Sequence, residues 1–208
     1  MRTLRVVTLA LLIASCSSGK HTSTPTPSVT VTRASPSPAA PSPSPLQTPV
    51  PAESNPPGDI PDNLAFVPYR NAAGRYRFVH PEGWAESARG STVLFTDKLN
   101  GVSALVGTLA APPTVTSARR DDVPSLRSSQ PAFELRRIAA VTEPGGSGVR
   151  IVYRRNSAPD PVTGRRYRDE VERFELVRAG REVVLELFGP VGADNVDAYR
   201  TMVQSLRF

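Results

Sequence analysis

The stretch RRYRDEVERFELVRAGREVVLELFGP, residues 165–190, decides the fold class of this chain. Apolar and charged residues alternate along much of it, as they do in strands with one buried face. The pair Ala179-Gly180 interrupts this pattern and is a turn signal. Two strands joined by so short a turn pair in an antiparallel manner. The stretch therefore predicts an antiparallel β-hairpin.

Strand patterns recur before this hairpin, in the segments RYRFVHP (75–81), STVLFTD (91–97), GVSALVGTLA (101–110), AFELRRIAAVTE (132–143) and GVRIVYRRNS (148–157). Turn signals lie between two of the pairs, at Leu99-Asn100-Gly101 and at Pro144-Gly145-Gly146. Short links of this kind join antiparallel neighbours. We therefore predict an antiparallel sheet of about six to seven strands.

Two segments have helical patterns instead. In SARRDDVPSLRSS (117–129), Ser117 or Thr116 can cap the helix, and Pro124 is expected to weaken or bend it. The closing segment NVDAYRTMVQSLRF (195–208) has Asp194 as its expected cap and apolar residues at helical spacing: Val196, Tyr199, Val203 and Leu206. Its apolar face should lie on the sheet, which predicts an α+β layered domain.

The amino end predicts a lipoprotein signal peptide over residues 1–15. Basic residues precede the apolar run 6–14, which is too short to span a bilayer. The sequence IASC (13–16) follows and resembles the bacterial lipobox, in which the cysteine thiol receives a lipid and becomes the mature amino terminus. An ordinary signal peptide with a chance cysteine is the alternative, but a free exported cysteine is a liability. We therefore expect lipidation of Cys16 and a location on the extracytoplasmic face of the cell membrane.

The next segment, residues 16–61, has the composition of a tether. It carries more than half of the chain's 22 prolines, many serines and threonines, and no apolar periodicity, so it cannot form a core. Proline at near-alternate positions favours an extended polyproline conformation, which suits a spacer open to glycosylation. The globular domain is accordingly predicted to span residues 62–208.

The charge pattern argues against nucleic-acid binding. The chain has a formal net charge of +6, and basic and acidic residues are mixed along 165–178 rather than separated. Such mixing is typical of a solvated strand face. Glu170, Glu172, Glu182 and Glu186 are therefore expected to form cross-strand ion pairs with Arg168, Arg173 and Arg181. A weak, salt-sensitive attraction to anionic lipids or wall polymers is the remaining electrostatic expectation.

Three segments together resemble one fold family. They are YRFVHPEGW (76–84), VVLELFGP (183–190) and DAYRTMVQSLRF (197–208). Their order and spacing are similar to those of the PsbP-like family, also called the Mog/PsbP-like α/β/α sandwich, over roughly residues 65–208. The resemblance implies an antiparallel sheet with helices on both faces, and a binding or assembly role rather than catalysis. Because the family includes actinobacterial lipoproteins, and arginine far outnumbers lysine here, an actinobacterial lipoprotein is expected.

The residues that could carry chemistry are few. His80 could serve as a catalytic base with a serine, but no G-x-S-x-G elbow is present, and a corner residue is the simpler interpretation. Trp84 could stack on a ligand, or could close the edge of the core. His80 and Trp84 are thus weak candidates for ligand or partner binding. No catalytic residue, metal site or cofactor is expected, since no phosphate loop, dinucleotide glycine set or zinc spacing occurs.

Three functions remain open from the sequence. The first is a lipid-anchored, extracytoplasmic binding or assembly module that acts through an envelope protein partner. The second is a carrier or sensor of an envelope lipid or another apolar small molecule, held in a pocket beside the sheet. A hydrolase that uses His80 ranks last.

Overall fold

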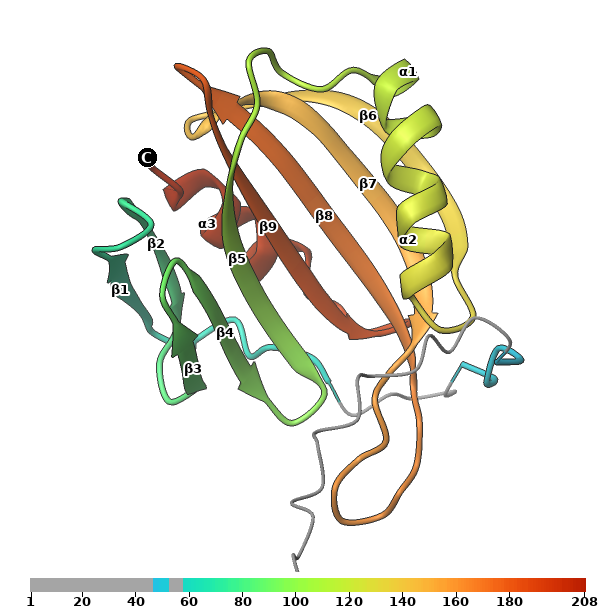
Figure 1. Cartoon of the computed structure of the whole chain (residues 1–208). Coiled ribbons are helices and arrows are strands. Elements are labelled where there is room, and N and C mark those ends of the chain that lie inside the picture. Colours follow the sequence, from blue (N-terminus) through green and yellow to red (C-terminus); the bar gives the residue numbers. More distant parts are fainter. Residues whose placement is uncertain (1–46, 53–57) are drawn as a thin grey trace, which may run out of the picture. The chain divides into compact units, whose positions relative to one another are not determined.

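The computed structural model describes residues 47–52 and 58–208. Cys16 and most of the predicted tether therefore lie outside the described residues. The elements follow one another in this order (Figure 1): β1 (Phe66–Asn71), β2 (Tyr76–Pro81), β3 (Ala85–Arg89), β4 (Thr92–Asp97), β5 (Asn100–Thr108), α1 (Val115–Ser117), η1 (Ala118–Asp122), α2 (Val123–Ser129), β6 (Glu134–Glu143), β7 (Gly146–Asn156), β8 (Arg168–Arg178), β9 (Arg181–Pro190) and α3 (Val196–Ser205).

Seven strands form one antiparallel sheet in the order β3-β4-β5-β9-β8-β7-β6. The hairpin predicted from residues 165–190 is β8–β9, with Arg178 opposite Arg181 across the Ala179-Gly180 turn. Both turn residues have positive φ, 50° and 77°, as a two-residue hairpin loop requires. The predicted antiparallel sheet is therefore confirmed.

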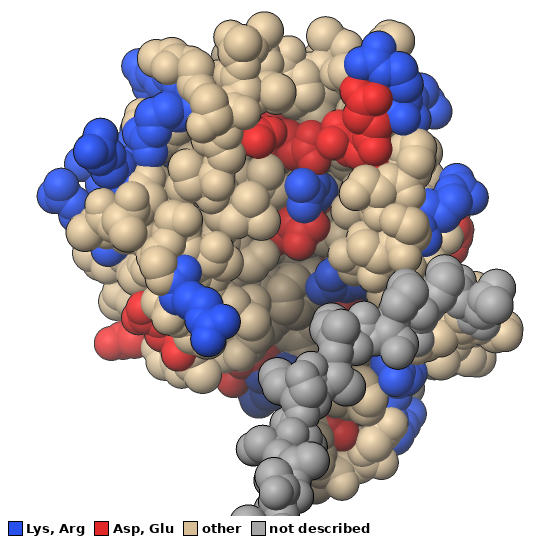
Figure 2. Space-filling model, viewed as in Figure 1, with Lys and Arg blue, Asp and Glu red and all other residues tan. Residues whose placement is uncertain are grey.

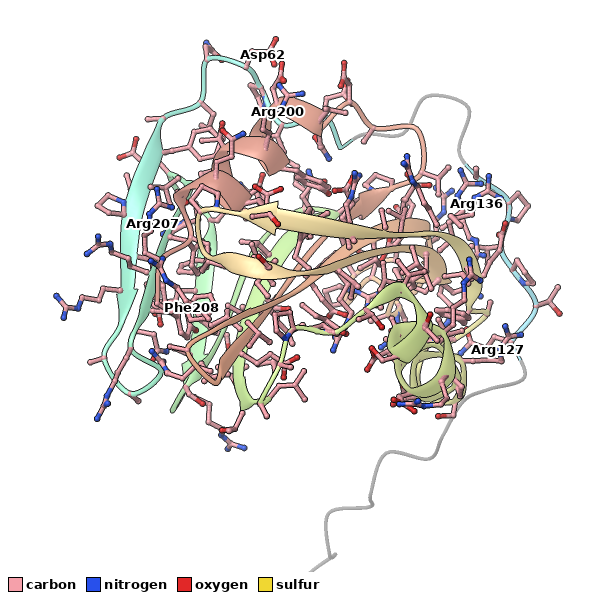
Figure 3. All side chains as sticks on the ribbon, turned by 90° about the horizontal axis from the view of Figure 1, so that it is seen from above. Asp62, Arg127, Arg136, Arg200, Arg207 and Phe208 are labelled. Carbon is pink, nitrogen blue, oxygen red and sulfur yellow. The ribbon has the colours of Figure 1, made fainter. Side chains whose placement is uncertain are left out.

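Helices cover both faces of this sheet (Figure 3). On one face, α3 packs on the main core. Every second residue of β8 and β9 contributes to this core, among them Phe174, Leu176 and Leu185. On the other face, α1, η1 and α2 cover a smaller apolar cluster that includes Leu126, Ile151 and Val171. Successive strand residues point to opposite faces, so β8 contributes to both cores. The observed α+β architecture confirms the predicted fold class.

The structure corrects several local predictions. The strand predicted at 75–81 pairs with β1 in a separate two-stranded sheet and does not join the main one. Strand β1 was missed because Pro68 interrupts it, and β3 was missed because all five of its residues are exposed and show no alternation. The β4–β5 turn is centred on Lys98-Leu99, one residue earlier than predicted, since Asp97 faces Asn100.

The helix caps also differ from the prediction. Thr114, not Ser117 or Thr116, caps α1, and its side chain and that of Ser117 form a reciprocal capping box. The N-cap of α3 is Asn195 rather than Asp194. Between α1 and α2, the turn Ala118–Asp122 is π-helical and leads directly into Pro124 near the start of α2. The predicted bend at this proline thus takes the form of one widened turn.

The chain upstream of residue 62 contacts the domain. Ile60 is buried in the core beside α3, and its N–H donates to Oδ1 of Asn195 at 2.7 Å. The Asn195 side chain also donates to Asn100, at 2.9 Å. Farther upstream, the N–H of Val50 donates to the side chain of Asn156 at 3.1 Å. Asn195 therefore does not cap α3 with its side chain, because that side chain holds the incoming chain against the sheet.

Candidate functional site: an arginine groove

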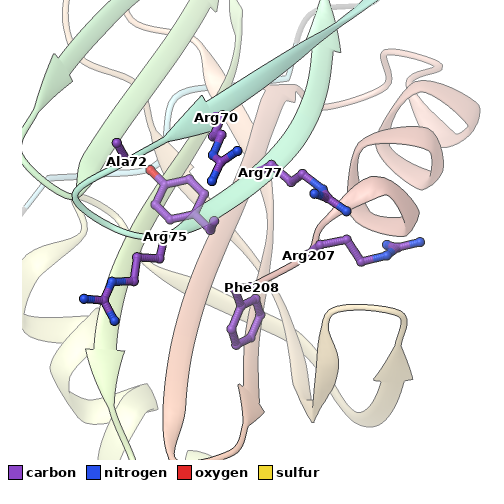
Figure 4. A pocket seen from close by; sticks show the side chains of 7 residues that line it. Arg70, Ala72, Arg75, Arg77, Arg207 and Phe208 are labelled. Carbon is purple, nitrogen blue, oxygen red and sulfur yellow. The ribbon is translucent and has the colours of Figure 1, made fainter.

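A groove of about 590 Å³ lies between the β1–β2 hairpin and the segment that follows α3 (Figure 4). We call it the arginine groove. It is lined by Arg70, Ala72, Arg75, Tyr76, Arg77, Arg207 and Phe208. Four of these seven side chains are guanidinium groups. The groove therefore concentrates positive charge on a chain whose other charges are mixed.

Three of the arginines form one row across neighbouring backbones. Arg70 lies directly opposite Arg77 in the β1–β2 register. Arg77 in turn exchanges two main-chain hydrogen bonds with Arg207, each 2.9 Å long. Directly opposed residues on neighbouring strands have α-carbons only about 4.5–5.5 Å apart, and like charges placed in this way destabilise a sheet. Such a row is unfavourable unless an anion offsets it.

These arginines have no acidic partner in the part of the chain that the structure describes. The guanidinium of Arg207 donates to the carbonyls of Gln204 and Leu206, both at 2.7 Å. No ion pair within residues 47–52 and 58–208 involves Arg70, Arg75, Arg77 or Arg207. An unpaired guanidinium presents a planar fork of N–H donors that matches a carboxylate or a phosphate. The groove is thus chemically suited to an anion.

The groove also has aromatic side chains. Tyr76 is almost fully buried, and its hydroxyl donates to the carbonyl of Ala104 at 3.4 Å. Burial raises the pKa of the Tyr76 hydroxyl, so this residue stays a neutral phenol and adds no negative charge. The Phe208 ring is half-buried beneath the guanidinium of Arg181, at 5.9 Å. An anionic group with an apolar part attached would meet both kinds of surface here.

The two candidates named from the sequence do not line this groove. His80 is buried, its ring stacks on Phe95 at 3.7 Å, and its Nδ1 lies 2.9 Å from the carbonyl of Pro81. Burial lowers the pKa of His80 and favours the neutral imidazole. Trp84 is 7% exposed and belongs to the core, although one side of it borders a separate hollow of about 340 Å³. The structure therefore does not bring His80 and Trp84 together with the arginines.

Of the expected cross-strand ion pairs, the part of the chain that the structure describes shows one. Glu186 on β9 accepts from Arg173 on β8 at 2.9 Å. Glu170 and Glu172 on β8 pair instead with arginines of β7, Arg154 and Arg150. Arg181 and Arg168 depart from the expected set, since Arg181 donates to the carbonyl of Gly74 at 2.6 Å and Arg168 pairs with Glu134 of β6.

A half-buried charged cluster lies between η1 and the sheet, where red and blue side chains lie together in a hollow of the surface (Figure 2). Arg173 donates to Glu175 at 2.5 Å and to Glu186 at 2.9 Å, and the Tyr153 hydroxyl also donates to Glu186. Burial raises the pKa of Glu175 and that of Asp122, which reaches it from η1. Among the described residues no group of three or more acidic, histidine or cysteine side chains is placed to hold a metal ion. We interpret this cluster as structural.

A neighbouring carboxyl group gives a pH prediction. Asp169 is 3% exposed, and burial raises its pKa to about 6, although Arg155 opposes the shift. When the pKa of a carboxyl is higher in the folded protein than in the unfolded chain, the group contributes stability that is fully present below the unfolded pKa. This stability is lost as the pH rises from the unfolded pKa through the folded pKa. We expect this group to lower the free energy of unfolding by up to about 3 kcal/mol between pH 4 and pH 7.

The Asp169→Asn variant should remove that part of the decline, as measured by urea unfolding at several pH values. Asp160→Asn is the control, because hydrogen bonds from Thr163 lower the pKa of that exposed carboxylate. An Asp169→Asn variant with the same pH slope as the parent would contradict the assignment.

Comparison with known proteins bears on the fold. No family model and no curated protein matches the chain. One similar solved structure is PsbP (CyanoP) from Synechocystis sp. PCC 6803, which is 17% identical, with 72% of this chain and 97% of that chain covered and a TM-score of 0.47. Another is the Ran-binding protein Mog1p from Saccharomyces cerevisiae, which is 10% identical, with 70% of this chain and 96% of that chain covered and a TM-score of 0.45. A third is LpqN, involved in cell envelope biogenesis of Mycobacterium tuberculosis. It is 13% identical, with 70% of this chain and 91% of that chain covered and a TM-score of 0.37.

The chain resembles these proteins in fold. This agrees with the PsbP-like resemblance predicted from the sequence. At such low identities and TM-scores the likeness concerns the path of the chain alone, and it assigns no site residue.

Sequence reasoning missed the arginine groove, although part of its signal was present. The segment YRNAAGRYRF (69–78), which becomes the end of β1, a turn and the start of β2, holds three arginines and no acidic residue. Arg70 and Arg77 lie opposite each other in the two strands, and Arg75 lies in the turn between them. Arg207, however, is 130 positions away from Arg77 and joins the row only in the folded chain.

Proposed function

We propose that this chain is a noncatalytic binding and assembly module of the cell envelope, anchored by lipid on Cys16, and that the arginine groove is its contact surface for an anionic envelope component. The observation that carries the proposal is the row of Arg70, Arg77 and Arg207, which lie side by side without an acidic partner among the described residues. Retaining such an unfavourable row makes physical sense if a ligand supplies the missing negative charge.

The anchoring part of the proposal rests on the sequence. The lipobox-like IASC (13–16) and the proline-rich residues that follow it support a lipid anchor with a spacer. No helix among residues 47–52 and 58–208 has the length and apolar character needed to cross a bilayer.

The carrier hypothesis has less support. Besides the arginine groove, a hollow of about 260 Å³ lies between α3 and the sheet, and it contains Arg150, Arg200, Glu143 and Glu172. Charged side chains in a pocket wall disfavour a wholly apolar ligand, because its arrival would strip them of water. An anionic component is the better match to the surfaces described.

Photocrosslinking from the groove tests the proposed function. A photoreactive amino acid in place of Ala72, which is exposed and lines the groove, should form an adduct in source cells that produce the full chain at native level. Adding Arg75→Glu and Arg77→Glu reverses two of the four positive charges, so we expect at least a tenfold loss of adduct. The adduct's mass and its sensitivity to protease identify a protein, a lipid or a glycan.

The matched control reverses two arginines on the other face of the sheet. Arg119→Glu with Arg127→Glu changes the net charge equally, at positions on η1 and α2 that lie away from the groove (Figure 3). This control should leave the adduct unchanged. Absence of any adduct, or an adduct that both double variants reduce equally, would overturn the proposal.

A further inference from the structure

The arginine groove is part of a larger basic end of the domain. Arg181, at the start of β9, donates to the carbonyl of Gly74 in the β1–β2 turn and lies over the ring of Phe208. Arg178 faces Arg181 across the β8–β9 turn. Six arginines from the β1–β2 hairpin, the β8–β9 hairpin and the segment after α3 therefore lie at this end: Arg70, Arg75, Arg77, Arg178, Arg181 and Arg207.

An exposed apolar loop adjoins these arginines. Thr108, the last residue of β5, lies opposite Arg181, so the residues that follow it leave the sheet beside the basic end. These residues, Leu-Ala-Ala-Pro-Pro (109–113), carry no charge, and Leu109 is 38% exposed. A small soluble anion would need no such loop. Basic side chains beside exposed apolar ones are typical of surfaces that lie on a membrane.

We propose that this end of the domain binds the surface of an anionic phospholipid membrane. The groove arginines contact the headgroup phosphates, and Leu109 with its neighbours enters the headgroup region. The proposal rests on the proposed function, because it names the anionic component that the groove binds. Guanidinium groups suit this role, since they are weakly hydrated and pair with phosphate through two hydrogen bonds.

Strand addition to β1 is a less suitable mode of binding for this end. The N–H groups of Arg77 and Val79 bond to Arg207 and Ser205, on the side of β2 that faces away from β1. Their partners in the β1 register, Arg70 and Pro68, must therefore direct their main-chain groups to the free edge of β1. Proline has no N–H, so Pro68 interrupts the ladder that an added strand would need. Side-chain contact with headgroups does not meet this obstacle.

The strength of the contact can be estimated. Each arginine near an anionic bilayer surface strengthens binding about fivefold at physiological salt. Replacing two of them by alanine should therefore weaken the contact roughly 30-fold. Because the attraction is electrostatic, it should largely vanish in about 1 M salt, where the screening length is about 3 Å.

A fluorophore in the apolar loop tests the proposal directly. The full chain with Cys16→Ser and Leu109→Cys would carry a polarity-sensitive label at position 109, and would be mixed with vesicles of phosphatidylglycerol and phosphatidylcholine or of phosphatidylcholine alone. The label reports the loop itself, so membrane binding by residues 1–15 does not produce the signal. We expect a blue shift, and quenching by spin-labelled lipid, only with phosphatidylglycerol.

Variants in this labelled background decide the outcome. Arg75→Ala with Arg77→Ala should require roughly 30-fold more phosphatidylglycerol for the same signal. Arg119→Ala with Arg127→Ala should behave like the parent. Equal signals on both kinds of vesicle, no signal on either, or displacement by millimolar inorganic phosphate or polyglutamate would overturn the lipid assignment.

The two proposals can fail separately. A protein adduct from position 72 that depends on Arg75 and Arg77, without any vesicle response, would overturn the lipid assignment and leave the proposed function standing. Loss of both signals would overturn both.

Discussion

Replacing Gly148 by valine is expected to destabilise the domain severely. Gly148 lies on β7 opposite Leu176 of β8, and a β-carbon at this position would come within 1.8 Å of the carbonyl oxygen of Glu175. The obstacle is the main chain of the neighbouring strand, so relief requires breaking the β7–β8 ladder at this point. The loss should exceed about 4 kcal/mol, which is a large part of the stability of a domain this size.

Circular dichroism and urea unfolding of the two proteins measure the effect. Ser147→Val is the matched control, because that neighbour already has a side chain and is only half-buried. It should shift the unfolding midpoint only slightly. A Gly148→Val protein with the parent's midpoint would show that β7 and β8 are not paired in this register.

Replacing Arg173 by methionine should destabilise the domain by about 3–5 kcal/mol at neutral pH. Arg173 is the counter-ion of Glu175, which is 2% exposed, and of Glu186 across the strand boundary. Without it, the buried Glu175 and the half-buried Glu186 lie near Asp122 with no positive charge between them. The loss comes from uncompensated charge rather than from a cavity, because methionine fills a similar volume.

The sign of the pH dependence distinguishes a loss of stability caused by uncompensated charge from one caused by a cavity. Burial already raises the pKa of Glu175, and removing Arg173 removes the charge that opposes this shift. A carboxyl whose pKa is raised in the folded state costs stability progressively as the pH rises from the unfolded pKa, and the loss is complete above the folded pKa. The Arg173→Met protein should therefore approach parental stability near pH 4 and lose it toward pH 7 in urea unfolding.

The same substitution in an exposed ion pair serves as control. Arg120 pairs with Asp121 in η1, and both side chains are more than half exposed. Arg120→Met should leave the unfolding curve unchanged at both pH values. A destabilisation by Arg173→Met that is equally large at pH 4 and pH 7 would indicate a packing role for Arg173.

Local pattern determined the fold class of this protein. The alternation in 165–190 and the turn at Ala179-Gly180 are properties of neighbouring residues, and they placed β8 and β9 correctly. Apolar spacing in the last segment likewise placed α3 on the sheet, although Val196, expected on the apolar face, is exposed. Strands that lack such a pattern, β1 with its proline and the wholly exposed β3, gave no local signal.

The arginine groove was decided only by the tertiary structure. The sequence shows arginines at alternate positions near residue 75, but nothing local says that Arg207 will exchange main-chain hydrogen bonds with Arg77. Nor does it show that the acidic residues will find other partners, as Glu172 does with Arg150. Strand periodicity depends on side chains a few residues apart, whereas a binding surface depends on which distant segments meet. The sequence alone therefore determined the layers of this protein, and long-range packing determined where its unpaired charge gathers.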